Sequence, residues 1–67
     1  MKDKTTLSPA ELEVLKTISP GLRSQEAADK LCVGKRTVDF HLRNIYRKLK
    51  VTNRVAAINE ARRKGLI

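Results

Sequence analysis

The sequence is poor in the residues that mark enzymes, metal sites and secreted domains. Its 67 residues include one cysteine, one histidine, one tyrosine, one phenylalanine and no tryptophan. The single Cys32 cannot form an internal disulfide, which fits a reducing cytoplasm. One cysteine and one histidine do not build a metal site with three protein ligands, and no nucleophile, base and acid form a catalytic set. We therefore expect that the protein is not an enzyme and that it holds neither a metal ion nor a cofactor.

Long apolar segments are missing as well. No apolar run approaches the ~18 residues of a membrane span. The N-terminus lacks the apolar region of a signal peptide. With 40% hydrophobic and 33% charged residues, the chain is foldable. These features predict a small cytoplasmic domain with no membrane partner.

The positive charge is confined to one half of the chain. Residues 1–34 carry five basic and five acidic side chains, whereas residues 35–67 carry ten basic side chains, Asp39 and Glu60. The whole net charge of +8 therefore lies in the second half. A polyanion is the natural partner of such a surface, bound in a salt-sensitive way through counterion release.

Helix start and stop signals predict an all-α domain and no strands. Ser8 and Glu11 form a capping box around Pro9, and Leu7 and Leu12 have the spacing of a hydrophobic staple. Four helices are expected, over residues 9–18, 25–31, 35–49 and 54–64. Residues 1–6 are expected to form a flexible tail, and residues 7–67 the domain.

Breaks between the predicted helices are marked by glycine, proline and asparagine. Ser19-Pro20-Gly21 ends the first helix, and Cys32-Val33-Gly34 forms a short turn after the second. Asn53 or Thr52 caps the fourth helix, which Gly65 terminates. A helix, a short turn and a basic helix form the helix-turn-helix pattern, and Ala27 and Ala28 permit the close approach that it needs.

The third helix has two faces of opposite character. At 100° per residue, its apolar stripe consists of Val38, Leu42, Ile45 and Leu49. The opposite stripe consists of Arg36, Phe40, Arg43 and Arg47. Guanidinium groups recognise phosphates and guanine edges, and an apolar ring can contact a thymine methyl group. We interpret this segment as a DNA recognition helix, and a solvated basic surface is the plainer alternative.

The predicted contacts to DNA fall into two groups. The candidates for reading bases are Arg36, Phe40, Arg43 and Asp39. The candidates for binding phosphates are Ser24, Lys35, Thr37, Arg47, Lys48 and Lys50. Phe40 has an alternative role as an aromatic residue buried in a dimer contact.

Four residues need separate interpretations. Asp39, a carboxylate beside the basic stripe, either pairs with Lys35, Arg36 or Arg43 or accepts a hydrogen bond from cytosine N4. His41 is expected to pack or to bind phosphate. Cys32 is interpreted as a small buried hydrophobic residue, and Tyr46 as an edge of the core with its hydroxyl outward.

From Leu7 to Ile67 the chain resembles the LuxR/NarL-type (GerE-like) DNA-binding domain of bacterial transcription regulators. Matching positions occur in order and without gaps, among them Leu7-Ser8, Glu11, Glu13-Val14-Leu15, Gly21, Ser24, Glu26, Ala28, Thr37-Val38, His41, Ile45, Lys48-Leu49-Lys50-Val51, Asn53-Arg54, Ala57, Ala61 and Gly65-Leu66-Ile67. The resemblance implies a four-helix domain whose third helix reads the major groove of duplex DNA.

The same resemblance implies a homodimer formed through the fourth helix. Ala57, Ile58 and Ala61 would face inward, which leaves Val55, Asn59 and Arg62 as the outer contact stripe. Because two of these three residues are polar, we expect a weak dimer or one formed on DNA. Asp39 departs from the resemblance, since its position is often Lys or Arg in the family.

One alternative function from another class stays open. The chain could be a protein-interaction module, such as an anti-activator or an adaptor that binds RNA polymerase, and Asp39 on the exposed face favours this slightly. The sequence also leaves open whether this is a small stand-alone regulator or a domain of a longer one. Selection from a pool of random duplexes distinguishes DNA binding from the protein-interaction alternative, because an adaptor enriches no DNA motif.

Overall fold

The computed structural model describes residues 7–67, so the expected tail over residues 1–6 lies outside the described part. Four helices follow in order: α1 (Pro9–Ile18), α2 (Ser24–Leu31), α3 (Lys35–Leu49) and α4 (Arg54–Arg63). Over residues 7–67 there is no strand. The all-α, four-helix prediction is confirmed, with boundaries within one residue of those expected.

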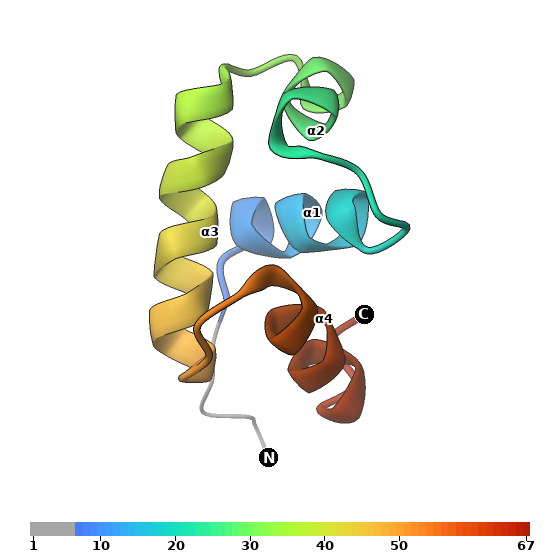
Figure 1. Cartoon of the computed structure of the whole chain (residues 1–67), viewed down its shortest axis with the longest axis vertical. Helices are drawn as coiled ribbons and strands as arrows, with labels where there is room; N and C mark the ends of the chain where they lie inside the picture. Colours follow the sequence, from blue (N-terminus) through green and yellow to red (C-terminus); the bar gives the residue numbers. More distant parts are fainter. Residues whose placement is uncertain (1–6) are drawn as a thin grey trace.

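α3 is the longest helix, and the other three pack against one side of it. In Figure 1, α3 runs along the long axis of the molecule, while α1, α2 and α4 all lie to its right. Each of these three helices contacts α3 directly. The other side of α3 is thus left uncovered by the rest of the domain.

The helix starts follow the capping signals of the sequence. The Ser8 hydroxyl accepts a hydrogen bond from Glu11 N–H at 3.1 Å, and the Glu11 carboxylate accepts one from Ser8 N–H at 2.9 Å. Asn53 Oδ1 accepts from Ala56 N–H at 2.8 Å and begins α4. α2 starts one residue earlier than expected because Glu26 accepts from Arg23 N–H at 2.7 Å, which makes Arg23 the capping position.

Three helices end in the same way, with a left-handed residue followed by an apolar one. Cys32, Lys50 and Gly65 have φ values of 58°, 59° and 75°. The next residue in each case donates its N–H back across the last turn: Val33 to Ala28, Val51 to Tyr46 and Leu66 to Ala61. This is the Schellman arrangement, and it satisfies carbonyls at the helix end. Lys50 and Cys32 adopt a backbone conformation that costs a non-glycine residue roughly 1 kcal/mol.

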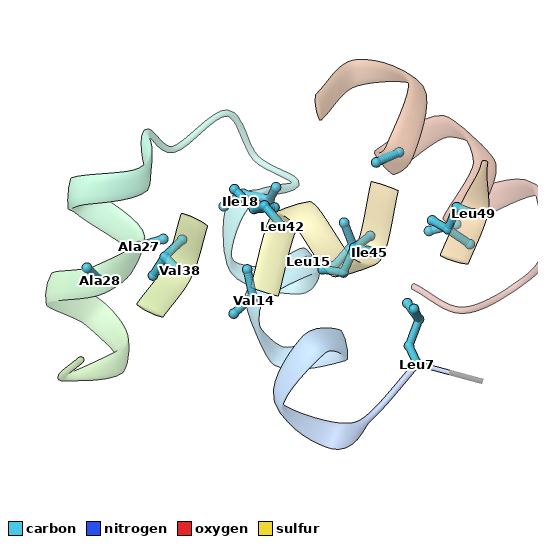
Figure 2. Packing of buried hydrophobic residues seen from close by; sticks show 12 residues of the cluster. Leu7, Val14, Leu15, Ile18, Ala27, Ala28, Val38, Leu42, Ile45 and Leu49 are labelled. Atoms are coloured by element: carbon cyan, nitrogen blue, oxygen red, sulfur yellow. The ribbon is translucent and has the colours of Figure 1, made fainter. Parts of the chain in front are cut away.

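Twelve buried apolar residues from all four helices and the segment before α1 form one core. The apolar stripe of α3 is buried as predicted, with Val38 and Ile45 fully inaccessible. Val38 lies toward Ala27 of α2, and Ile45 lies beside Leu15 of α1 (Figure 2). The small Ala27 and Ala28, both fully buried, let α2 approach α3 closely. This packing fixes which face of α3 remains outside.

Candidate nucleic-acid interface

The uncovered face of α3 carries the predicted reading residues. Arg36, Phe40, Arg43 and Arg47 are all exposed. Phe40 is 58% accessible, a large apolar ring presented to solvent. Within residues 7–67 none of the three arginines forms an ion pair. Their guanidinium groups are therefore available to an anionic or hydrogen-bonding partner.

Phe40 stands against its neighbour His41. The two rings meet edge to face, with centroids 5.7 Å apart and planes at 62°. His41 is half-buried and its charge acts on Glu11 of α1. The expectation that His41 packs agrees with this placement. The contact covers only part of Phe40, which remains 58% accessible.

Asp39 is paired along its own helix. Lys35 Nζ lies 2.9 Å from Asp39 Oδ2, one helical turn away. Of the three partners considered from the sequence, the structure selects Lys35. The Lys35 hydrogen bond lowers the pKa of the Asp39 carboxyl most strongly, and desolvation raises it by less. The Ser24 hydroxyl and the Arg54 charge make smaller contributions that also lower it. Asp39 is thus a paired carboxylate on the flank of the exposed face of α3.

Lys48 and Glu11 join α3 to the start of α1. Lys48 Nζ donates to Glu11 Oε1 at 2.8 Å, and Glu11 is only 5% accessible. Burial raises the pKa of Glu11, but the Lys48 and Ser8 hydrogen bonds, with the charges of Lys48 and His41, outweigh it and lower the pKa overall. One carboxylate therefore both caps α1 and binds α3. The sequence predicted the cap and missed the ion pair.

This arrangement predicts a stability loss in acid that depends on Glu11. A carboxylate with a lowered pKa stabilises the fold above its unfolded pKa of about 4.3, and the contribution disappears as the pH falls through the folded value. Glu11→Gln should destabilise the domain by about 1–2 kcal/mol at pH 7. The difference from wild type should shrink below roughly pH 4.

Urea unfolding of both proteins between pH 3 and pH 7 measures this difference. Glu13→Gln, on the exposed side of the same helix, is the matched control and should change stability little at any pH. Equal stability of Glu11→Gln and wild type at pH 7 would show that the Lys48–Glu11 ion pair contributes nothing to stability.

Ser24 differs from the other predicted phosphate contacts. Lys35, Thr37, Arg47, Lys48 and Lys50 are all exposed, whereas Ser24 is 8% accessible. The Ser24 hydroxyl accepts a hydrogen bond from Arg54 Nη2 at 2.8 Å, and Arg54 Nη1 donates to the Leu22 carbonyl at 2.9 Å. No local sequence pattern indicates this contact, because Ser24 and Arg54 are 30 residues apart.

α4 divides into an inner and an outer face as expected. Ala57 and Ala61 are fully buried, and Ile58 packs against the core from a half-buried position. The outer stripe of Val55, Asn59 and Arg62 is exposed, and Val55 is 67% accessible. The surface expected for dimerisation therefore exists as a solvent-facing strip.

One side chain lies elsewhere than expected. Cys32 is exposed, so its interpretation as a buried hydrophobic residue is wrong. The left-handed backbone that ends α2 turns the Cys32 side chain away from the core. Tyr46, in contrast, packs against the core from a half-buried position, as an edge residue should.

Neither metal nor membrane chemistry emerges from residues 7–67. In this part of the chain no three histidine, cysteine, aspartate or glutamate side chains gather where they could hold a metal ion. None of the helices described has the length and apolarity needed to cross a membrane. The exposed basic face of α3 is the feature that stands out chemically.

The arrangement of α2, a short turn and a basic α3 over a small core defines a helix-turn-helix domain. Residues 5–61 match the family described as "Bacterial regulatory proteins, luxR family". The chain belongs to this family of bacterial regulatory proteins.

Several relatives support the family assignment. The chain is 41% identical over 96% of its length to the HTH-type transcriptional regulator AlkS of Alcanivorax borkumensis, and covers 7% of that protein. It is 40% identical over its full length to the HTH-type transcriptional activator RamA of Corynebacterium glutamicum, of which it covers 24%. It thus spans a minor part of the curated relatives it matches.

A solved structure shares the fold. The crystal structure of the response regulator ChrA, from a heme-sensing two-component system, superposes with a TM-score of 0.90 at 44% identity. The match covers 98% of this chain and 33% of the ChrA chain. The fold predicted from the sequence and its resemblance to LuxR-type domains are therefore both confirmed.

Proposed function

We propose that this chain binds duplex DNA sequence-specifically, with α3 in the major groove, and thereby takes part in regulating transcription in the bacterial cytoplasm. The observation that carries the proposal is the uncovered face of α3, where an exposed phenylalanine lies among three arginines that form no ion pair with any of residues 7–67. The major groove, about 12 Å wide, admits a helix of this kind. The family and its named transcriptional regulators support the same function.

In this proposal the exposed residues divide between reading and anchoring. Arg36, Asp39, Phe40 and Arg43 are the readers; from Arg36 to Arg43 α3 rises about 10 Å, the length of about three base pairs. Anchoring to phosphates belongs to Lys35, Thr37, Arg47, Lys48 and Lys50. For Ser24, whose hydroxyl oxygen already accepts a hydrogen bond from Arg54, we assign the phosphate contact to the backbone N–H at the start of α2.

Two copies of the chain would bind one site through α4. The exposed strip of Val55, Asn59 and Arg62 offers one apolar and two polar side chains, which supports a weak dimer that DNA strengthens. Two copies would read half-sites about one helical turn apart, as an inverted or direct repeat. RNA polymerase is a further partner that fits a regulator.

Selection from a pool of random duplexes tests the proposal. The wild-type chain should enrich a motif containing two half-sites, each about three or four base pairs long. Binding to the enriched duplex should weaken steeply as salt rises, since each phosphate contact releases counterions. If no motif is enriched, the chain is not a sequence reader, and the protein-interaction alternative takes its place.

A further inference from the structure

Arg54, the first residue of α4, is hydrogen-bonded to the segment before α2 and to the first residue of α2. Its two terminal nitrogens donate to the Leu22 carbonyl at 2.9 Å and to the Ser24 hydroxyl at 2.8 Å. Ser24 is the first residue of α2, and its hydroxyl also acts on Asp39 of α3. The two partners of Arg54 lie 32 and 30 residues away from it in the sequence. The contacts therefore come from tertiary structure alone.

The order of donors in this cluster follows from the Ser24 hydroxyl. A hydroxyl has one proton to donate, and an arginine can only donate. Ser24 Oγ accepts from Arg54, so its own proton points away from Arg54, and the Ser24 hydroxyl lowers the pKa of the Asp39 carboxyl. Lys35 holds the other side of the same carboxylate at 2.9 Å.

We propose that Arg54 is a positioning residue, which sets the start of α2 and the carboxylate of Asp39 in the places that DNA reading needs. Arg54 itself does not read a base in this proposal. The inference rests on the proposed function, because it concerns how that reading face is held. A lysine cannot replace Arg54, since two donors in a rigid fork are needed to reach a carbonyl and a hydroxyl together.

The test compares Arg54→Met and Arg54→Lys with wild type on the selected duplex and on a scrambled one. Arg63→Met is the matched control: Arg63 lies on the same helix, is exposed, and pairs only with Glu60 among residues 7–67. Binding is measured at a temperature where circular dichroism shows each variant folded. We expect Arg54→Met to reduce the ratio of specific to non-specific affinity about tenfold and Arg54→Lys to restore little of it. Arg63→Met should leave the ratio unchanged.

Two further readouts separate positioning from general stability. In an Asp39→Asn background, the effect of Arg54→Met on the ratio should largely disappear, because the carboxylate it positions is gone. The pKa of the Asp39 carboxyl, followed by NMR without DNA, should rise in Arg54→Met and stay unchanged in Arg63→Met.

Three results would overturn the inference. A folded Arg54→Met with wild-type discrimination rejects the positioning role and leaves the proposed function standing. Unfolding of both Arg54 variants makes Arg54 a residue needed for folding rather than for reading. If the wild-type chain itself does not discriminate between the two duplexes, the proposed function fails and the inference fails with it.

Discussion

Arg43→Ala should weaken binding to the selected duplex by about 10- to 100-fold and relax the preference at one base pair, since one bidentate arginine–guanine contact contributes about 1–3 kcal/mol of discrimination. Arg43 is exposed and forms no ion pair within residues 7–67, so its replacement breaks no ion pair in this part of the chain. The loss should therefore report on DNA alone. Titrations of the selected duplex and its single-base variants measure it.

Arg47→Ala is the matched control, because Arg47 is exposed one turn further along the same face of α3. Removing a phosphate anchor should weaken binding to the specific and the scrambled duplex equally, and it should lower the salt dependence of binding by about one phosphate contact. If Arg43→Ala behaves in the same way, with equal losses on both duplexes, Arg43 is an anchor and its assignment as a reader is wrong.

Ile45→Ala should unfold a large share of the molecules at 37 °C. Ile45 of α3 is fully buried beside Leu15 of α1. Truncating such a residue lowers the free energy of unfolding by about 2–5 kcal/mol. At about 0.05–0.15 kcal/mol per residue, a domain of this size is stable by roughly 3–10 kcal/mol in total. The loss therefore approaches the whole stability, and thermal unfolding followed by circular dichroism measures it.

Val55→Ala provides the comparison for Ile45→Ala. Val55 is 67% accessible on α4, so its truncation opens no cavity, and alanine has the higher helix propensity. The midpoint of thermal unfolding of Val55→Ala should stay close to that of wild type at a low protein concentration. A similar loss in both variants would mean that the core does not centre on α3.

Local signals predicted the fold well because its helix ends depend on residues close in sequence. Ser8 and Glu11 are three residues apart, as are Asn53 and Ala56, and each pair forms the cap that the sequence indicates. The 100° periodicity of α3 likewise identified its buried stripe. Patterns among residues three or four positions apart are enough to predict helix caps and the buried face of a helix.

Contacts across the fold could not be predicted in this way. Glu11 and Lys48 are 37 residues apart, and Ser24 and Arg54 are 30 apart. Only the packing of α1, α2 and α4 on α3 brings these side chains together. The sequence assigned Ser24 and Lys48 to phosphate alone because their internal partners become visible only in three dimensions. Of the predicted readers, Arg36, Phe40 and Arg43 are exposed, whereas Asp39 is half-buried and paired with Lys35 one turn away on the same helix.

Cys32 has a practical consequence that comes from its left-handed, exposed position. It is the single thiol of the chain, and it sits in the turn between α2 and α3. A thiol-reactive fluorophore would therefore attach at one defined point, three residues before the helix proposed to enter the groove. The domain thus carries a built-in site for an optical probe of its encounter with DNA.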